Sequence, residues 1–434
     1  MQTQTREDYR TLLLAAVGGT LEFYDFVIFV FLATVMGHVF FPTGSPDWLL
    51  QIQTYAIFAA GYLARPLGGI IMAHFGDLRG RKRMFMLSVF LMALPTFAMG
   101  LLPGYATLGI GAPALLLFLR ILQGAAIGGE IPGAWVFVSE YAPAGRVGFA
   151  CGVLTGGLTM GIMLGSLVGS AMHALFSIEQ LTLYAWRIPF LLGGVFGLVA
   201  VYLRSYLKET PVFKRMQIEK TLAQNWPIKQ IVCEHRMAVV LSILVTSLLT
   251  AGIIITVLMT PTLLTKISSI HTTDAFLANC LAVFCLSLSC VGYGYLIDRC
   301  GVALTLIAGS IVFALISYGF YALIPQHPNW LFPMYALLGT ALGLITTVPC
   351  LMVRLFPPPV RFSGLSFAYN VAYAFFGGVT PILVVLLLHY YGHLAPAYYI
   401  AVLSLVAVLV GCYLLFSGEK EFVEVFPHTH THIT

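Results

Sequence analysis

Residues 76–83 read GDLRGRKR and place five charged side chains between two long apolar segments. The flanking segments, Gln51–Phe75 and Met84–Leu102, are each close to the length of about 20 apolar residues that a helix needs to cross a bilayer. Lipid offers no hydrogen-bond partners, so a segment that crosses it must satisfy its own backbone groups, as a helix does. The sequence around GDLRGRKR therefore predicts two membrane-spanning helices joined by a short basic turn.

The composition of the whole chain agrees with a membrane protein. Of its 434 residues, 59% are hydrophobic and only 9% are charged, whereas soluble proteins carry about 25% charged residues. So few charges cannot cover the surface of soluble domains, which excludes an ordinary soluble enzyme and a disordered chain. The net charge is only +5 and the basic residues are scattered, so nucleic-acid binding is disfavoured. The apolar runs are continuous rather than alternating, which excludes an outer-membrane barrel.

Twelve apolar segments of spanning length follow one another, with turn sequences such as FPTGSPD, YAPAGR and FPPPVR between them. They are Leu12–His38, Gln51–Phe75, Met84–Leu102, Pro113–Ser139, Val147–His173, Trp186–Leu207, Met237–Leu264, Ala275–Ile297, Val302–Ile324, Asn329–Val353, Phe362–His389 and Ala397–Phe416. The first is too long, and too charged within, to be the apolar core of a cleaved signal peptide. The pattern predicts an all-α polytopic membrane protein with twelve transmembrane helices.

A polar, charged segment near the middle of the chain separates six spans from six. We predict an N-terminal half (1–207), a cytoplasmic linker (208–236), a C-terminal half (237–417) and a cytoplasmic tail (418–434). GYLIDRCG, Gly294–Gly301, follows the eighth span as GDLRGRKR follows the second, and each places an Asp, a basic residue and a Gly at one end of a span. This repetition indicates two equivalent halves, a common build of transporters.

The basic residues predict which way the chain is inserted. If the N-terminus is cytoplasmic, eighteen of the 22 Lys and Arg residues face the cytoplasm, and Arg204 at the end of the sixth span is counted among them. Arg187 and Lys266 fall outside, and Arg65 and Arg120 fall within spans. Because short cytoplasmic loops are enriched in Lys and Arg, we expect both termini to be cytoplasmic.

Seven segments of the chain resemble the major facilitator superfamily (MFS), and within it the metabolite:proton symporter family. They are GGTLEFYDF (18–26), RPLGG (65–69), GDLRGRKR (76–83), LRILQGAAIGGE (119–130), FVSEYAP (137–143), WRIPF (186–190) and YLRSYLKETPVF (202–213). GDLRGRKR is similar to the superfamily's signature between its second and third helices, and FPPPVRFSGLSFAYN (356–370) fits the family less tightly. Its members are proton symporters for proline and betaine, citrate, alpha-ketoglutarate, shikimate and dicarboxylates.

The resemblance implies the MFS fold and a secondary active transporter that works by alternating access in a bacterial inner membrane. The proton gradient would be its energy source, and no cofactor is expected. Its partners would be a small-molecule substrate, protons and the lipid bilayer, and we expect a monomer. We find no ATP-binding loop and no catalytic constellation, so we expect neither ATP-driven transport nor an enzyme.

Five charged residues fall inside predicted spans: Glu22, Asp25, Arg65, Arg120 and Glu130. A charge at mid-membrane costs about 2.5–3.5 kcal/mol on insertion scales, so such residues are functional candidates, although they can also simply hold helices together. Three acids against two guanidiniums leave one acid over, and a proton or another cation must compensate it. We therefore predict proton coupling at these acids, preferring Asp25, then Glu22, then Glu130.

The spacing of these five residues predicts some of their partners. Glu22 and Asp25 are three residues apart and share one face of the first helix, where two carboxylates do not easily both ionise. Arg65, just before Pro66, is the expected cation for them. Arg120 and Glu130 lie about 15 Å and roughly 80° apart on one helix, so they cannot pair. Arg120 then needs an anion from another helix or from the substrate, and a guanidinium suits a carboxylate.

The second half has almost no intramembrane charge, so we expect proton coupling in the first half. Polar aromatic and amide side chains are its candidates for substrate contact: Tyr369, Asn370 and Tyr373, of which the two tyrosines are four residues apart on one face. Tyrosines that only pack between helices are an equal alternative. We predict a substrate site made by Arg65, Arg120, Tyr24, Tyr369, Asn370 and Tyr373.

The loops after the second and eighth spans are candidates for a gate. Asp77, at a helix end, can meet basic residues and helix dipoles across the two halves, and breaking such contacts would open the cytoplasmic side. The alternative is that these charges only orient the chain. The predicted gate residues are Asp77, Arg81, Glu140, Arg146, Asp298 and Arg299.

Three substrate classes remain open from the sequence. A small mono-, di- or tricarboxylate is favoured because Arg120 suits an anion. A carboxylate-type metallophore (siderophore) fits the same cation. A proline- or betaine-type zwitterion would need an aromatic cage, which Phe23, Tyr24, Phe26 and Trp135 could supply, but the chain lacks the long coiled-coil extension of osmosensing members. A membrane enzyme would need a catalytic constellation and a non-transporting sensor would need a soluble output domain, and the sequence predicts neither. No metal site is predicted, and the alternating His428, His430 and His432 are interpreted as a disordered tail.

Overall fold

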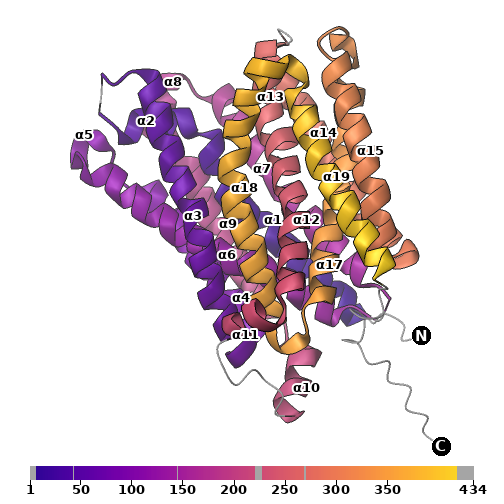
Figure 1. Ribbon diagram of the computed structural model, residues 1–434. Coiled ribbons are helices and arrows are strands. Elements are labelled where there is room, and N and C mark those ends of the chain that lie inside the picture. Colours follow the sequence, from indigo (N-terminus) through magenta and orange to yellow (C-terminus); the bar gives the residue numbers. More distant parts are fainter. Residues whose placement is uncertain (1–5, 43, 144, 220–226, 268–269, 418–434) are drawn as a thin grey trace, which may run out of the picture.

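The computed structural model describes residues 6–42, 44–143, 145–219, 227–267 and 270–417, and in these ranges the regular structure is helical throughout (Figure 1). Eleven segments are long and apolar enough to cross a membrane, and the last of them, Pro358–Phe416, contains two long helices. The described chain therefore has twelve spans, which confirms the predicted all-α, twelve-helix fold. The tail 418–434, with its histidines, lies outside the described residues.

The first six spans form the half drawn from indigo to magenta in Figure 1. Its helices are α1 (Arg6–Phe31), α2 (Ala33–Phe40), α3 (Asp47–Arg79), α4 (Arg81–Leu101), α5 (Tyr105–Leu108), α6 (Gly111–Tyr141), α7 (Val147–Leu175), α8 (Ile178–Gln180), the π-helical η1 (Leu181–Ala185) and α9 (Arg187–Ser205). The predicted first span is interrupted at Leu32, between α1 and α2.

The last six spans form the half drawn in rose, orange and yellow. Its elements are α12 (Arg236–Ile253), the π-helical η2 (Ile254–Met259), α13 (Thr260–Ile267), α14 (Thr272–Cys300), α15 (Val302–Leu323), η3 (Pro328–Trp330), α16 (Leu331–Leu342), η4 (Gly343–Thr346), α17 (Thr347–Leu355), η5 (Pro358–Val360), α18 (Arg361–Tyr391), η6 (Gly392–Leu394) and α19 (Ala395–Phe416). The seventh and tenth spans thus change helix type midway. Such changes often mark bending points.

Two short helices of the linker, α10 (Pro211–Glu219) and α11 (Pro227–Glu234), lie at one end of the bundle (Figure 1). This end is called the linker face below, and the other end the opposite face. α10 contacts α6 and η5, and α11 contacts α3 and α18. Each linker helix therefore touches both halves.

The two halves turn in the same way at equivalent places. α3 passes into α4 through Gly80 alone, and α14 passes into α15 through Gly301 alone. Both glycines have positive φ, 119° and 85°, which side-chain-bearing residues rarely adopt. The repeated Asp, basic and Gly pattern of the sequence therefore corresponds to the same helix–glycine–helix turn in each half.

Glycines of α7 allow this helix to lie against a helix from each half. Gly157 and Gly161 pack against α1, and Gly152 packs against α14, where a Cβ would stand 2.5 Å from the Cys290 carbonyl oxygen. Small residues at such contacts let helix backbones approach closely in membranes. α7 is thus one of the helices through which the first half meets the second.

Candidate functional site

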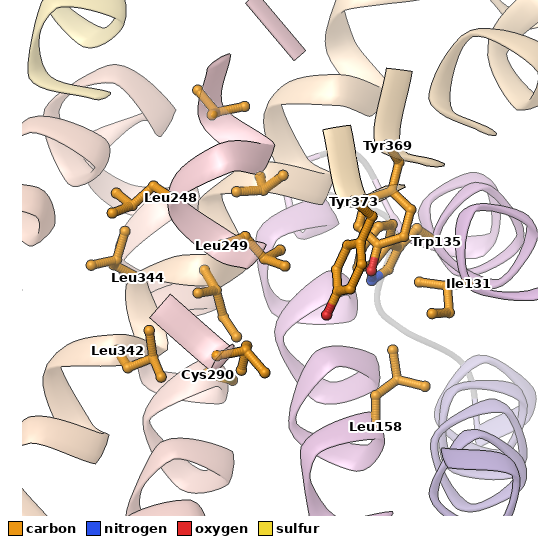
Figure 2. Packing of buried hydrophobic residues seen from close by; sticks show 14 of the residues in the cluster. Ile131, Trp135, Leu158, Leu248, Leu249, Cys290, Leu342, Leu344, Tyr369 and Tyr373 are labelled. Atoms are coloured by element: carbon orange, nitrogen blue, oxygen red, sulfur yellow. The ribbon is translucent and has the colours of Figure 1, made fainter. Parts of the chain in front are cut away.

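A small cavity lies between the two halves near the middle of the bundle. Its volume is about 40 Å³, which is room for a few water molecules, whereas substrate pockets are typically about 300–1,000 Å³. Its walls are mostly apolar and aromatic: Phe23, Ile131, Trp135, Thr155, Leu158, Thr159 and Ile162 from the first half, and Leu249, Ile253, Ile345, Tyr369 and Tyr373 from the second. Figure 2 shows Tyr369 and Tyr373 beside Trp135 and Ile131. Both halves are therefore packed closely around this centre.

Arg65 borders this centre from α3. Its guanidinium carbon lies 4.2 Å from the centre of the Tyr373 ring and 5.4 Å from that of Tyr369. Its Nε donates to Oδ1 of Asn370 at 3.3 Å, and Nδ2 of Asn370 donates to the Gly128 carbonyl at 2.6 Å. The expected pairing of Arg65 with Glu22 and Asp25 is wrong, because Arg65 faces α18 of the other half instead.

Arg120, on α6, lies in a pocket of phenylalanine rings. Its guanidinium carbon is 4.1 Å from the centre of the Phe29 ring and 5.2 Å from those of Phe26 and Phe58. Its Nη1 donates to Oε1 of Gln123, while Nε and Nη2 have no hydrogen-bond partner. Among the residues that the structure describes, no carboxylate pairs with Arg120, although the side chain is buried.

Tyr62 connects the surroundings of these two arginines. Its ring packs against those of Phe26 and Phe58, beside Arg120, and stacks on that of Tyr373, beside Arg65. The centre of its own ring is 5.5 Å from the Arg65 guanidinium. No sequence pattern distinguishes Tyr62 from the other tyrosines of the chain, which has 21 in all.

Arg204 is the cation that holds Glu22 and Glu130. Its Nη2 donates to Glu22 at 2.7 Å and to Glu130 at 2.9 Å, and Nη1 donates to the Phe85 carbonyl at 3.2 Å. Counting Arg204 among the basic residues that face the cytoplasm was wrong, since its side chain is 0% exposed. A residue close to a helix end can extend a long side chain inward, and a count of charges per loop does not detect this.

Asp25 stands apart from all three arginines. Both of its carboxyl oxygens are buried without a hydrogen-bond partner. The carboxyl group lies against α9, where a Cβ on Gly193 would be 2.5 Å from Oδ1. Its backbone carbonyl accepts from Nε2 of Gln123 at 3.2 Å, and the same Nε2 donates to Thr96 at 2.8 Å. Gln123, which the sequence did not single out, therefore links Arg120 to the helix that carries Asp25.

Tyr24 lies away from the cavity, contrary to its prediction as a substrate contact. Its hydroxyl donates to the Pro189 carbonyl at 2.9 Å, and its ring packs edge-on against Phe196 of α9. Phe23, one residue earlier, does line the cavity. Successive side chains on a helix point about 100° apart, so only one of Phe23 and Tyr24 faces the cavity, and the sequence alone does not indicate which.

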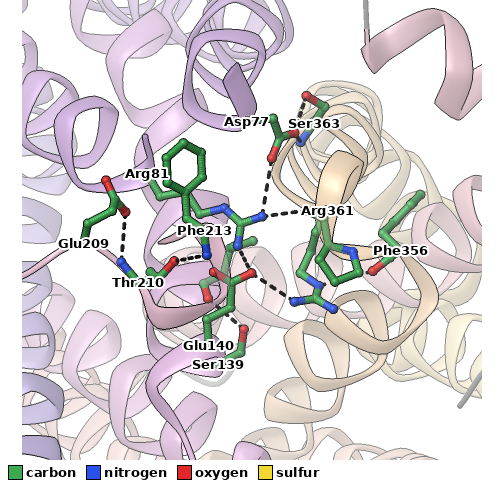
Figure 3. A network of polar contacts seen from close by, with 12 residues as sticks. Asp77, Arg81, Ser139, Glu140, Glu209, Thr210, Phe213, Phe356, Arg361 and Ser363 are labelled. Carbon is green, nitrogen blue, oxygen red and sulfur yellow. Dashed lines mark hydrogen bonds and ion pairs between the residues drawn. The ribbon is translucent and has the colours of Figure 1, made fainter. Parts of the chain in front are cut away.

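A second polar cluster joins the halves at the linker face (Figure 3). Asp77 of α3 accepts from the backbone N–H of Ser363 at 2.9 Å and from its hydroxyl at 2.8 Å. Ser363 belongs to the first turn of α18, so the carboxylate meets the positive end of that helix dipole. Arg81 lies 3.6 Å from Asp77 and donates to the Pro358 carbonyl at 2.6 Å.

Glu140 of α6 is shared by two arginines of this cluster. It pairs with Arg81 of its own half and with Arg361 of α18, the latter at 3.0 Å. Arg361 also donates to the Phe356 carbonyl at 3.2 Å. The sequence predicts a cytoplasm-facing charge at Arg361, whereas its side chain is 0% exposed and is part of this contact between the halves.

Asp298 repeats the arrangement of Asp77 with the halves exchanged. It accepts from the backbone N–H groups of Gly148 at 2.6 Å and Phe149 at 2.7 Å, in the first turn of α7. Arg146 caps α7 and interacts electrostatically with Asp298. Arg299 is exposed and lies over the Tyr295 ring, and no ion pair is recorded for it within the described ranges.

The two clusters do different chemistry. Asp77 and Asp298 each bind a helix N-terminus of the other half at the linker face. The buried charges outside the linker-face cluster lie within the spans: Arg65, Arg120, Asp25, Glu22, Glu130 and Arg204. No group of three or more His, Cys, Asp or Glu side chains that could hold a metal occurs among the described residues. The interior is thus suited to binding an anion and to holding protons.

Comparison with known proteins places this architecture in a family. Residues 11–230 match the protein family described as "Sugar (and other) transporter". The chain is 31% identical to the citrate-proton symporter of Klebsiella pneumoniae, over 93% of this chain and 91% of that protein. It belongs to the major facilitator superfamily, in the metabolite:proton symporter family. This MFS protein is also 30% identical to the proline/betaine transporter of Salmonella typhimurium, over 93% of this chain and 82% of that one.

Solved structures agree on the fold. The structure of the proton:xylose symporter XylE bound to 6-bromo-6-deoxy-D-glucose superposes with a TM-score of 0.77 at 16% identity, covering 96% of both chains. At that identity the likeness concerns the MFS fold alone. Membership of the family makes this protein a multi-pass membrane transporter for a small molecule, as its resemblance implied.

Proposed function

We propose that this MFS protein is a proton-coupled symporter of a small organic anion, and that it works by alternating access. The observation that carries the proposal is the pair of buried guanidiniums of the first half, Arg65 and Arg120, for which the described residues supply no carboxylate. An unpaired buried charge is costly, so each of these cations favours an anion that arrives from outside the chain. A planar guanidinium binds a carboxylate through two parallel hydrogen bonds.

The substrate enters between the halves, where the cavity touches Tyr369 and Tyr373. These tyrosines are also the rings against which Arg65 lies. Asn370, from the same helix, supplies Arg65 with its one amide acceptor. Opening on either side would widen the cavity and let a carboxylate replace that acceptor.

Proton coupling is assigned to the acids of the first half: Glu22 and Glu130, which share Arg204, and Asp25, which has no cation. The Klebsiella relative, a citrate-proton symporter, supports coupling to protons. The first half alone carries these acids, because the spans of the second half hold no buried carboxylate among their described residues.

The linker face is assigned to the cytoplasm of a bacterial inner membrane. Six spans on either side of the linker bring both chain ends to the linker's side. Most Lys and Arg residues of the loops fall there, as the positive-inside rule requires. Asp77, Glu140 and Asp298 are then the cytoplasmic gate, which is closed here, with Arg81 and Arg361 as their partners.

A zwitterion of the proline or betaine type is the second candidate, and the lining of the cavity favours it. Phe23, Trp135, Tyr369 and Tyr373 present rings to the cavity, and rings attract quaternary ammonium groups. The Salmonella relative is named as a proline/betaine transporter. A zwitterion would however leave one of the two guanidiniums without an anion. No feature of the described residues favours a metallophore over a small carboxylate.

A thermal-shift experiment on the purified full chain separates the candidates. Succinate, 2-oxoglutarate and citrate are expected to raise the melting temperature, and glycine betaine and proline are not. The rise should vanish in Arg120→Gln and persist in Arg236→Gln, a matched change at an exposed arginine outside the site. Stabilisation by glycine betaine and by none of the acids would overturn the organic-anion assignment.

A further inference from the structure

The buried charges of this protein balance in two separate groups. Ten charged side chains are buried among the described residues, five acids and five arginines. The gate at the linker face holds Asp77 and Glu140 with Arg81 and Arg361. The membrane interior holds Glu22, Asp25 and Glu130 with Arg65, Arg120 and Arg204. Within each group the numbers of acids and bases are equal.

The interior group has equal numbers of acids and arginines, but they are not paired one to one. Arg204 holds two carboxylates, and Glu22 and Glu130 each keep one further oxygen without a hydrogen-bond partner. Asp25 has no cation, and Arg65 and Arg120 have no carboxylate. Two negative charges are therefore in excess at the acids. Two positive charges are in excess at Arg65, which lies over the cavity-lining rings of Tyr369 and Tyr373, and at Arg120, whose phenylalanine pocket adjoins Tyr62.

A net charge in a low-dielectric interior is expensive, and an effective penalty of several kcal/mol per ion remains even after relaxation. The interior must therefore keep its total charge close to zero whether or not substrate is bound. The second half cannot compensate, because the only buried charge among its described residues is Arg361 of the gate. Each negative charge that a substrate brings must be matched by one proton on an interior acid.

We propose that the protein carries its anion with one proton per negative charge, and that its preferred substrate is a dianion taken up electroneutrally with two protons. This inference rests on the proposed function and adds to it the charge class of the substrate and the stoichiometry. Two carboxylates of the substrate bind the two guanidiniums that lack one, Arg65 and Arg120. One proton binds Asp25, and the other binds an oxygen of the Glu22 and Glu130 pair.

The surroundings of these acids agree with one proton at each place. Asp25 faces Thr96 of α4 and the glycines 193 and 197 of α9, and Tyr24 is its neighbour on α1. None of these is a cation, so when the substrate occupies Arg65 and Arg120 only a proton can neutralise Asp25. Glu22 faces Arg204 of α9, Glu130 of α6 and Asp25 on its own helix. One guanidinium compensates one of the two glutamates, and a proton compensates the other.

The test is uptake by the full chain in proteoliposomes, with radiolabelled succinate, 2-oxoglutarate, citrate and glycine betaine as probes. Each probe is measured with a pH gradient alone, with a negative-inside potassium diffusion potential alone, and with both. One pH unit corresponds to about 1.4 kcal/mol per proton, which is a factor of about ten. Two protons then accumulate succinate and 2-oxoglutarate about 100-fold per pH unit, and the potential changes neither rate nor extent.

Asp25→Asn removes one proton site and should change the coupling. Uptake of a dianion with one proton moves negative charge inward, so a negative-inside potential should now inhibit it, and accumulation should fall to about tenfold per pH unit. Asp274→Asn, at an exposed carboxylate, should behave as the unchanged protein does. A pH-sensitive dye counts protons directly: two per succinate in the unchanged protein.

The outcomes separate this inference from the proposed function. If succinate and 2-oxoglutarate accumulate with the pH gradient but a negative-inside potential stimulates or opposes their uptake in the unchanged protein, the stoichiometry is wrong and the anion symporter remains. If only glycine betaine accumulates, or no probe responds to the pH gradient, the proposed function itself is wrong. Potential-independent uptake with two protons per dianion supports both.

Discussion

Arg204 and Arg120 are two buried guanidiniums of the same half, and each lies over a phenylalanine ring. Arg204 is 3.5 Å above Phe85 and binds two carboxylates, whereas Arg120 is 4.1 Å above Phe29 and binds only the amide of Gln123. Arg204 faces two carboxylates, one more than its single charge compensates, whereas Arg120 faces no carboxylate. Chemically identical side chains can therefore be compensated by carboxylates in one place and lack an ion-pair partner in the other.

Removing Arg204 and removing Arg120 should therefore change the free energy of unfolding differently. Removing one partner of a buried ion pair leaves an uncompensated charge and costs about 3–5 kcal/mol, whereas removing a buried charge that has no partner relieves a desolvation penalty. Arg204 should therefore matter mainly for stability. Arg120 should matter mainly for binding.

Arg204→Gln is expected to have the largest effect. It leaves Glu22 and Glu130 facing each other without a cation, so unfolding should become easier by about 3–5 kcal/mol, with a melting temperature many degrees lower. Replacing both glutamates by Gln in the same chain should recover most of that loss. A melting temperature unchanged from that of Arg236→Gln would contradict the assignment of Arg204 as the structural cation.

Arg120→Gln should give the opposite pattern. Its melting temperature without ligand should equal or exceed that of the unchanged protein, because a lone buried charge is gone. Binding of the acid that stabilises the protein most should weaken about 10- to 100-fold, since hydrogen bonds to charged groups contribute about 1.5–3 kcal/mol. Titration with that acid, followed by tryptophan fluorescence, measures the affinity of Arg204→Gln and of Arg120→Gln. A large loss of stability with unchanged affinity would mean that Arg120 is structural, as Arg204 is.

The sequence predicted the twelve spans because hydrophobic length is a local property of the chain. It also found the acids and guanidiniums that are far from any span end, such as Glu22 and Arg120. It missed Arg204 and Arg361 because both stand near span ends, where buried and cytoplasmic arginines look alike. It paired Arg65 with the wrong helix because its partner, Asn370, is 305 residues away, and only the packing of the halves brings them together.

Glu140 at the gate is the mirror image of Arg204, since one acid there is shared by two arginines. Glu140→Gln leaves Arg81 and Arg361 buried with backbone carbonyls and without their shared acid. Opening of the linker face returns both arginines to water, so the loss should appear as opening of the contact between the halves rather than as unfolding, by at least about 1.4 kcal/mol, a tenfold shift.

Cysteine labelling can measure that shift. Cys151 and Cys350 are buried, whereas Cys233 and Cys300 are exposed and provide an internal reference. Maleimide labelling followed by peptide mass spectrometry should therefore show Cys151 and Cys350 reacting faster in Glu140→Gln, with Cys233 and Cys300 unchanged. Equal labelling of all four in both proteins would show that Glu140 does not hold the gate closed.

Gln123→Glu should make the surroundings of Arg120 resemble those of Arg204, with the smallest effect of the four. The new carboxylate would stand where the amide oxygen now accepts from Arg120, and the substrate would have to compete with it. Affinity for the acid should fall by about fivefold, or about 1 kcal/mol, while Gln230→Glu, at an exposed position, should leave it unchanged. The stability should change little, because the gained ion pair is offset by the loss of the amide donor to Thr96 and to the Asp25 carbonyl. Unchanged affinity in Gln123→Glu would mean that Arg120 does not meet the substrate, and the contrast with Arg204 would then be one of packing alone.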